Sequence, residues 1–267
     1  MRRDFLTRIG CLSAEVTGKG HPLLLLHANP GDSHDYEAVV PALAKEFQVH
    51  ALDWPGYGLS LASQPDKLSA MAFADSLEDV VGSLGSEPVG IIGNSVGGFA
   101  AARFAMRYPE KVAALVLVNS SGFTRHTLIS RLFCRIMGLP WFNTLVDPWL
   151  AEYYLRVRTP AVKAMLNRAV ARKLDTHFGR ISSAVWRSFL STEHDLRGIA
   201  SGIVTPTMLA WGRHDFLLPL VTDGRTAESC IPQSELIVFD TGHAPFAEAP
   251  ESFLAVAMPF LRMHIGA

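Results

Sequence analysis

The stretch that decides the fold runs Val89-Gly90-Ile91-Ile92-Gly93-Asn94-Ser95-Val96-Gly97-Gly98. Its first five residues are continuously apolar, as in a strand buried on both faces, and Val96 to Tyr108 is rich in helix formers. Gly93 to Gly97 is therefore a G-x-S-x-G sequence between a predicted strand and a predicted helix. Such a sharp turn holds its serine out at the strand end in a strained backbone conformation. This context makes Ser95 a candidate nucleophile.

Outward from this stretch, apolar runs of strand length alternate with longer helical patterns from about residue 21 to 119. That alternation predicts βαβ units and a parallel sheet. Beyond residue 200 two further runs are typical of strands, and a closing helix is expected over Glu251 to Leu261. The six predicted strands are Leu23 to His27, Gln48 to Asp53, Val89 to Gly93, Val112 to Asn119, Thr207 to Trp211 and Glu235 to Phe239.

Residues 124 to about 200 contain helical patterns and scattered aromatics but no convincing strand, so we expect a helical insertion there. Ten Arg and two Lys against two Glu and three Asp give this segment a net charge of +7, in a chain whose net charge is −1. Two interpretations stay open. The favoured one puts the arginines on solvated faces of exposed helices, and the other makes them ligands of an anionic substrate.

The composition of the whole chain narrows the class of protein. Of its 267 residues 49% are hydrophobic and 18% charged, which suffices for a sizeable core. The net charge of −1 provides no field to attract nucleic acid or an anionic membrane, so a small-molecule substrate is expected. No uncharged apolar stretch approaches the roughly 18 to 20 residues of a membrane span. The sequence leaves the oligomeric state open, a homo-oligomer included.

The cysteines indicate the compartment and exclude one kind of metal site. Cys11, Cys134 and Cys230 are odd in number and widely spaced, with no CxxC pair. Charged residues interrupt the N-terminal segment, so no signal peptide is predicted. We therefore predict a cytoplasmic protein that uses neither a metal nor another cofactor.

A serine hydroxyl needs a base to take its proton, and His243 is the best placed of the ten histidines. It follows the last predicted strand, at the edge of the sheet where α/β sites lie. The base in turn needs an acid, which Asp215 supplies after the strand that ends at Trp211. Asp240 is the competitor, but local geometry would point it away from His243. His126 and His194 have no strand-end placement, and we expect them to be exposed or packed.

An oxyanion intermediate needs hydrogen-bond donors. Two backbone amides are predicted for this role, those of Val96 and Asn29. Val96 directly follows the candidate nucleophile, and Asn29 lies in the loop after the first parallel strand, before Pro30, which has no N–H.

These residues resemble the α/β-hydrolase superfamily across essentially the whole chain. His27-Ala28-Asn29-Pro30-Gly31 is similar to the family's HGxPG loop, with Ala28 in place of the usual Gly, and Asp53-Trp54-Pro55-Gly56-Tyr57-Gly58-Leu59-Ser60 resembles its DxPGxGxS turn. The resemblance implies a mostly parallel eight-stranded sheet flanked by helices, with a helical cap inserted after strand 6. It divides the chain into a first core part (1–122), a cap (123–200) and a second core part (201–267).

The resemblance also bears on the reaction. Ser95 separates the chain from haloalkane dehalogenases and epoxide hydrolases, which carry Asp at this position. The GNSxGG form resembles carbon–carbon bond hydrolases of vinylogous diketone acids, although the loop lacks their HGxGPG form and Ala244 stands where an aromatic residue is common. Hydrolysis of a small carboxylic ester through an acyl-enzyme is therefore the favoured reaction. The alternatives are carbon–carbon hydrolysis, perhydrolase or haloperoxidase chemistry, and a receptor that retains the triad. The candidate substrate-binding residues are Asn94, Trp186, Arg187 and Phe246.

Overall fold

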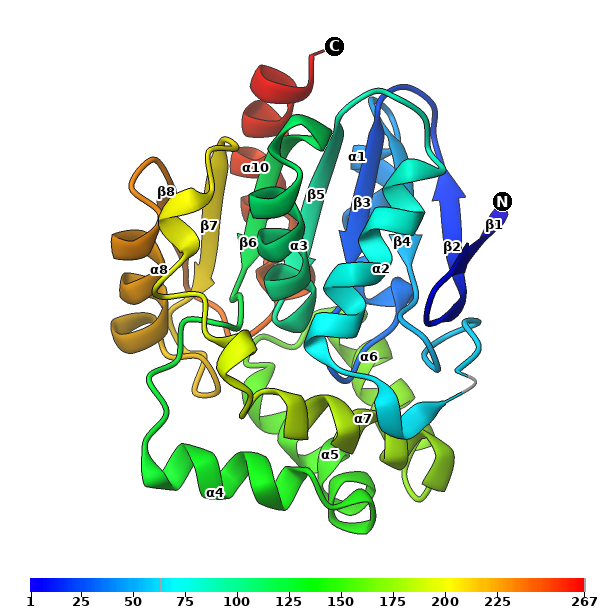
Figure 1. Ribbon diagram of the computed structural model, residues 1–267, viewed down its shortest axis with the longest axis vertical. Coiled ribbons are helices and arrows are strands. Elements are labelled where there is room, and N and C mark those ends of the chain that lie inside the picture. Colours follow the sequence, from blue (N-terminus) through cyan, green and yellow to red (C-terminus); the bar gives the residue numbers. More distant parts are fainter. Residues whose placement is uncertain (63, 267) are drawn as a thin grey trace.

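Eight strands form a single sheet in the order β1-β2-β4-β3-β5-β6-β7-β8 (Figure 1). The structure is a computed structural model, and it describes residues 1–62 and 64–266. The strands from β3 to β8 run parallel to their neighbours, whereas β2 pairs antiparallel with both β1 and β4. The strands are β1 (Arg2–Thr7), β2 (Gly10–Thr17), β3 (Pro22–Leu26), β4 (Gln48–Leu52), β5 (Val89–Asn94), β6 (Val112–Val118), β7 (Thr207–Gly212) and β8 (Glu235–Phe239).

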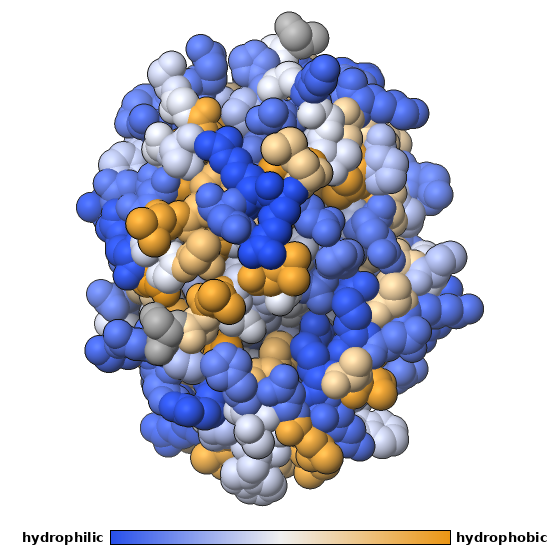
Figure 2. Space-filling model, turned by 90° about the vertical axis from the view of Figure 1, so that its right-hand side faces the viewer, coloured by the Kyte–Doolittle hydropathy of each residue, from blue (hydrophilic) through white to orange (hydrophobic). Residues whose placement is uncertain are grey.

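All six strands predicted from apolar runs are present, as β3 to β8, and the expected mostly parallel eight-stranded sheet is confirmed. The apolar runs did not reveal β1 and β2. β1 is the edge strand and β2 lies next to it, and both carry exposed side chains, so charged residues such as Asp4 and Glu15 interrupt their apolar pattern. Figure 2 faces the side of the molecule where β1 lies, and it shows hydrophobic and hydrophilic residues intermixed on this surface.

Helices cover both faces of the sheet (Figure 1). On one face lie α2 (Ala70–Gly82) and α3 (Val96–Arg107), and on the other α1 (Val40–Leu43) and α10 (Pro250–Ile265). The predicted helices after Ser95 and over Glu251 to Leu261 are confirmed as α3 and α10. Two short helices, α8 (Arg225–Cys230) and α9 (Pro245–Glu248), complete the second core part.

Four helices lie together at the end of the sheet to which the parallel strands point their carboxyl ends (Figure 1). We call them the cap helices; they are α4 (Leu128–Met137), α5 (Pro140–Tyr154), α6 (Pro160–Ala171) and α7 (Thr176–Ser188). The side chains of Thr127, Thr159 and Asp175 cap α4, α6 and α7, because each accepts a hydrogen bond from a free amide of the first turn. The helical insertion is thus present, and its division from the core at residues 123 and 200 stays a prediction.

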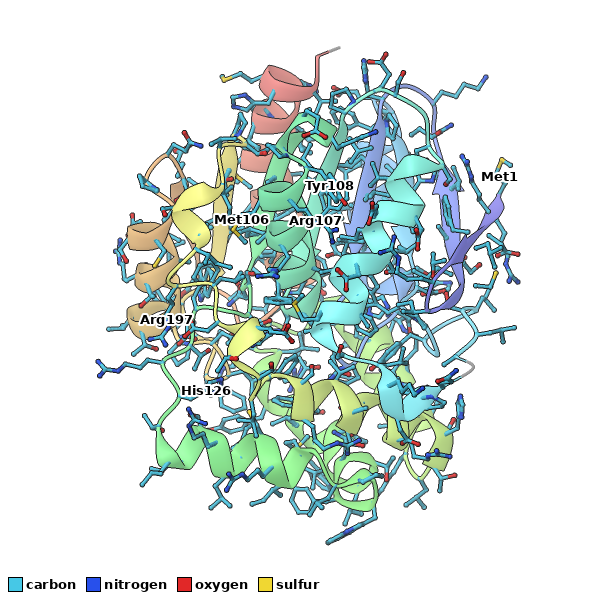
Figure 3. The ribbon with its side chains drawn as sticks, in the orientation of Figure 1. Met1, Met106, Arg107, Tyr108, His126 and Arg197 are labelled. Carbon is cyan, nitrogen blue, oxygen red and sulfur yellow. The ribbon has the colours of Figure 1, made fainter. Side chains whose placement is uncertain are left out.

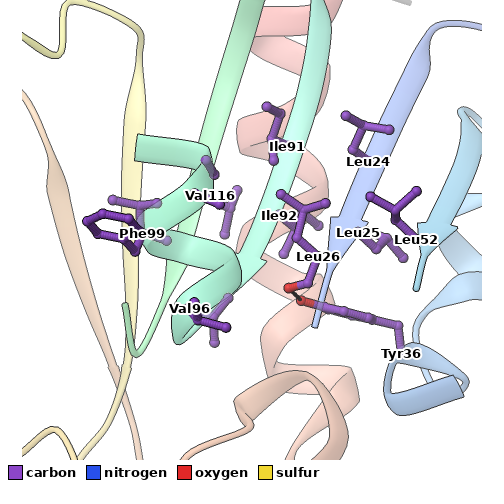
Figure 4. Packing of buried hydrophobic residues seen from close by; sticks show 14 of the residues in the cluster. Leu24, Leu25, Leu26, Tyr36, Leu52, Ile91, Ile92, Val96, Phe99 and Val116 are labelled. Atoms are coloured by element: carbon purple, nitrogen blue, oxygen red, sulfur yellow. Dashed lines mark hydrogen bonds between the residues drawn. The ribbon is translucent and has the colours of Figure 1, made fainter. Parts of the chain in front are cut away.

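The core is built on the central parallel strands (Figure 4). Leu23 to Leu26 of β3 are completely buried, and Ile91, Ile92 and Val116 of the neighbouring strands pack beside them. The phenol of Tyr36 donates a 2.9 Å hydrogen bond to the carbonyl oxygen of Leu26 at the end of β3. This packing fixes the carboxyl end of β3, from which the loop with Asn29 begins.

Ion pairs join the cap helices to the core. The Arg168 guanidinium lies 2.9 Å from the Asp35 carboxylate and also pairs with Asp32, and Arg172 lies 3.1 Å from Asp32. Part of the positive charge of the cap is therefore paired with acidic residues of the core, which neither interpretation of the charge asymmetry predicted. Within residues 1–62 and 64–266 no helix has both the length and the apolar character to cross a membrane.

Candidate active site

Ser95 stands at the turn between β5 and α3 with φ 54° and ψ −115°, a left-handed conformation that non-glycine residues rarely adopt. The turn is pressed against the end of β3, because a Cβ on Gly97 would collide with the carbonyl oxygen of Leu26. The Ser95 amide donates to the Val118 carbonyl at 3.0 Å. Neighbouring chain thus holds the strained serine at the carboxyl edge of the sheet.

The loops after β7 and β8 bring Asp215 and His243 together. His243 Nδ1 lies 2.6 Å from Asp215 Oδ2, and both side chains are buried. Asp240 is exposed and pairs with His214 at 2.8 Å instead. Of the two acids that the sequence offered, Asp215 is therefore the one bonded to His243.

Further donors hold the Asp215 carboxylate in place. Asn119 Nδ2 donates to its Oδ2 at 2.6 Å, and the amides of Leu217 and Leu218 donate to its Oδ1 at 2.9 and 3.2 Å. Asn119 also accepts a hydrogen bond from the Gly212 amide at 3.0 Å. Sequence reasoning had assigned Asn119 only to the end of a strand, and its polar side chain at that strand end was the available signal.

Glu248 is a second residue that sequence reasoning missed. Its buried carboxylate accepts hydrogen bonds from the amides of Gly242 and Ala244, on either side of His243, at 2.9 and 3.0 Å. It also accepts from the amides of Arg156 and Val157, which follow α5, at 2.7 and 2.9 Å. One carboxylate thus ties the His243 loop to the cap helices. The signal was an acidic residue in the otherwise apolar run from Ala244 to Pro250.

The loop after β3 lies beside Ser95. Asn29 accepts a 2.5 Å hydrogen bond from the Tyr57 hydroxyl and donates to the Ser182 carbonyl of α7 at 3.2 Å, and its peptide bond to Pro30 is cis. No hydrogen-bond acceptor for the Asn29 amide lies within residues 1–62 and 64–266. Val96 is the first residue of α3, so its amide has no partner within the helix. Both amides predicted for the oxyanion are therefore available.

A cavity lies between these loops and the cap helices. Ser95, His243 and Asn29 line it, and its apolar walls come from both parts of the chain. In the described part of the chain, no Asp, Glu, Lys or Arg lines this cavity. The principal apolar wall residues are Phe133, Leu150, Trp186, Phe189, Leu217 and Leu218.

Three of the four residues predicted to bind substrate do not line the cavity. Asn94 uses its buried amide to bond the carbonyls of Val118 and His243, at 3.0 and 3.1 Å, and so braces the sheet edge. Arg187 is exposed and bonds the Gly138 carbonyl at 2.6 Å. Phe246 is buried in the core, where its ring stacks on Tyr36. These three assignments are corrected, and only Trp186 reaches the cavity.

A group of polar residues in the cavity wall was not predicted. Ser121 Oγ lies 3.1 Å from His194 Nε2, and both residues line the cavity together with His126. In Figure 3, His126 is labelled just before α4, between the sheet and the cap helices. Burial lowers the pKa of His194 to about 3, so its imidazole is neutral at physiological pH. His194 is packed, as expected, but it also faces the cavity.

The fold and the loops at its carboxyl edge define an α/β hydrolase. The model of the alpha/beta hydrolase fold family matches residues 21–174, more than half of the chain, and the protein belongs to that family.

Several relatives of this chain have names that state an activity. The chain is 28% identical to a pimeloyl-[acyl-carrier protein] methyl ester esterase of Nitrosomonas europaea, over 90% of this chain and 96% of that protein. It is 26% identical to a 2-hydroxy-6-oxo-6-phenylhexa-2,4-dienoate hydrolase of Comamonas testosteroni, over 92% and 89%. A thermophilic esterase from Thermogutta terrifontis has the same fold, with a TM-score of 0.82, 23% identity and full coverage of both chains. The chain is thus an α/β-fold hydrolase enzyme.

Proposed function

We propose that this protein is a serine hydrolase that cleaves a small carboxylic ester through an acyl-enzyme, with Ser95 as nucleophile, His243 as base and Asp215 as its acid partner. The observation that carries the proposal is the buried 2.6 Å bond between His243 and Asp215, beside a cavity that Ser95 and His243 share. The esterase relative supports the same reaction class.

The proposed mechanism begins at His243. Because Nδ1 is bonded to Asp215, Nε2 is the nitrogen that takes the Ser95 proton as Oγ attacks the ester carbonyl. The imidazolium that forms then gives this proton to the leaving alcohol, and the acyl group remains on Ser95. Water, deprotonated by His243, attacks the acyl-enzyme and releases the acid. Asp215 stabilises the imidazolium in both halves through its 2.6 Å hydrogen bond to Nδ1.

The negative charge on the carbonyl oxygen needs donors at each attack. The free amides of Val96 and Asn29 are the proposed pair. The side-chain bonds of Asn29 to Tyr57 and Ser182 hold its backbone in place before the reaction begins. A preorganised donor of this kind is typically worth about 3 to 4 kcal/mol of transition-state stabilisation.

The lining of the cavity favours a neutral substrate. The 2-hydroxy-6-oxo-dienoate named for the Comamonas relative is a carboxylate, and no Lys or Arg of the described residues lines the cavity to receive one. A carboxylate moved into such a site without a partner pays a large desolvation cost. Carbon–carbon hydrolysis is therefore the second candidate, behind ester hydrolysis. For the location we propose the cytoplasm, which suits the three free cysteines.

The test compares turnover of short-chain p-nitrophenyl esters by the wild type, Ser95→Ala and the matched control Ser76→Ala. Ser76 is a buried serine of α2, which bonds the Phe73 carbonyl and does not line the cavity. We expect Ser95→Ala to lower kcat by about 10⁴-fold or more with unchanged unfolding, because no core contact is removed. Ser76→Ala should keep the wild-type kcat.

Each other outcome has a defined meaning. Wild-type turnover by Ser95→Ala would refute the assigned nucleophile. A preference for a dienol-type diketone acid over the esters would promote carbon–carbon hydrolysis. Absence of turnover on both substrates by the wild type would favour a receptor that keeps the triad.

A further inference from the structure

We propose that Ser121 and His194 form a substrate-recognition pair that binds a second, neutral oxygen of the substrate, such as a ketone or ether oxygen. This inference rests on the proposed ester hydrolysis and specifies its substrate class. The pair lies beside the nucleophile, because the Ser121 amide donates to the Ser95 carbonyl at 3.1 Å.

The pair is rigid. The His194 ring packs between the rings of Phe99 and Phe189, with centroids 4.4 and 4.7 Å away, and its amide donates to Ser191. Ser121 Oγ accepts from or donates to His194 Nε2 at 3.1 Å. Among the described residues, His194 Nδ1 has no further hydrogen-bond partner. A buried polar pair with unused capacity in the wall of a cavity needs an explanation.

Proton counting shows what the pair offers. If the serine hydroxyl donates to Nε2, the proton of the neutral ring is on Nδ1 and is free to donate. If Nε2 donates to the serine, the hydroxyl proton is free instead. Either tautomer leaves one unused donor, and burial keeps the ring uncharged. The matching ligand group is therefore a neutral oxygen acceptor rather than a carboxylate.

The experiment uses a pair of isosteric esters, p-nitrophenyl 4-oxopentanoate and p-nitrophenyl 4-methylpent-4-enoate, in which a ketone oxygen is replaced by a methylidene group. The measured quantity is the kcat/KM of the ketone ester divided by the kcat/KM of the methylidene ester. We expect Ser121→Ala to lower the ratio about tenfold, and Ser121→Thr, which keeps the hydroxyl, to restore most of it. Parallel loss on both esters, or an unchanged ratio, would overturn the proposal.

A second measurement does not depend on turnover. In the Ser95→Ala variant, the ¹⁵N resonances of the His194 ring, assigned with His194→Phe, should shift more with methyl 4-oxopentanoate than with methyl 4-methylpent-4-enoate. Equal shifts would contradict the recognition pair even if the protein is an esterase. A selective shift without wild-type ester turnover would keep the pair and refute the proposed function.

A different observation carries a second proposal: we infer that the outer surface of α4 and α5 docks on an anionic lipid membrane. Large apolar side chains of these two helices are exposed, including Trp141 at 67% and Trp149 at 71%. Exposed apolar clusters of this kind mark interaction surfaces. We call this surface the cap face; it consists of Leu128, Ile129, Leu132, Trp141, Leu145, Trp149 and Tyr153.

Charge identifies the partner of the cap face. Arg125, Arg131 and Arg135 are exposed beside it and have no side-chain hydrogen bond or ion pair within the described residues. The segment 124–146 contains these three arginines and no acidic residue. Apolar and tryptophan side chains combined with unpaired cations are typical of helices that lie in a membrane interface. A second copy of the chain is a poor occupant, because two-fold symmetry would oppose the arginines of the two copies.

The position of the cap face links it to the cavity. The opposite side of α4 lines the cavity with Phe133 and Cys134. A docked α4 would therefore bring the cavity next to the bilayer. The net charge of −1 had suggested no attraction to anionic membranes, but it averages over the positive cap and the acidic remainder of the chain.

The test is co-sedimentation of the whole protein with vesicles of phosphatidylcholine, with or without phosphatidylglycerol. We expect binding only with phosphatidylglycerol, reduced about tenfold or more in Arg131→Glu/Arg135→Glu and in Trp141→Ala/Trp149→Ala. The matched controls are Lys19→Glu, in the turn between β2 and β3, and Met263→Ser, near the end of α10, which lie at the other end of the molecule (Figure 1).

Three results would overturn the second proposal. They are absence of vesicle binding, equal binding to both vesicle types, and equal loss of binding in the controls. Sedimentation analysis adds a fourth: a wild-type dimer that Trp141→Ala/Trp149→Ala dissociates would assign the cap face to a second copy of the chain.

Discussion

At the scale of single residues, the buried carboxylates differ in whether hydrogen-bond donors offset the cost of burying their charge. The carboxylates of Asp215 and Glu248 are buried, and each is satisfied by several N–H donors. Asp147 of α5 is equally buried, yet neither of its carboxylate oxygens has a hydrogen-bond partner within residues 1–62 and 64–266. Burial raises its pKa to about 6, although Arg172 partly opposes this shift.

This raised pKa predicts a pH-dependent stability. Because the folded state holds the Asp147 proton more tightly than the unfolded state, the free energy of unfolding falls as pH rises from about 4 to about 6. Asp147→Asn removes that loss. Relative to wild type, the variant should gain up to about 3 kcal/mol between pH 4 and pH 8, measured by urea unfolding at both pH values. The exposed Asp240→Asn should show no such gain, and a pH-independent difference for Asp147→Asn would contradict the prediction.

At the scale of elements, four of the six parallel strands each supply one part of the site through the loop that follows their carboxyl end. The loops after β3, β5, β7 and β8 contribute Asn29, Ser95, Asp215 and His243. The site requires these loops to be held in place. Glu248 at the end of α9 holds the His243 loop, because it joins that loop to the segment after α5.

Glu248→Gln therefore should act on both stability and turnover. The side-chain amide of the glutamine would point an N–H at one or more of the backbone N–H groups that now donate to the carboxylate. Because those donors would lose their acceptor, we expect a loss of about 2 kcal/mol in unfolding free energy. A loosened His243 should lower kcat more than it changes KM. Urea unfolding and ester kinetics measure the two effects, with the exposed Glu87→Gln as control. Lower stability with an unaltered kcat would limit Glu248 to a structural role.

At the scale of the whole molecule, the cap helices are attached to the core by ion pairs of very different burial. Arg168 pairs with the buried Asp32 and Asp35, and burial together with the neighbouring Asp32 raises the pKa of Asp35 to about 7. Arg180 and Asp66 form a pair that is exposed to solvent.

The two kinds of pair should respond differently to loss of the arginine. At pH 8, Arg168→Ala leaves two buried carboxylates short of a partner, so we expect it to lower the unfolding free energy by about 2 to 3 kcal/mol. Arg180→Ala should cost less than about 1 kcal/mol, because solvent screens that pair. Urea unfolding of both variants measures the difference, and similar losses would show that burial does not govern the attachment of the cap.

The sequence alone determined the six strands from β3 to β8, the strained position of Ser95 and the choice of Asp215 and His243. These follow from local periodicity and from the rule that parallel strands present their following loops at one edge. Only the tertiary structure decided where Asn94, Arg187 and Phe246 point, because a side chain's direction depends on distant partners such as the Val118 carbonyl and Tyr36. For the same reason, only the tertiary structure revealed the roles of Glu248 and of the Ser121–His194 pair. Ser121 and His194 are 73 residues apart in the chain, and Glu248 is 92 residues from Arg156.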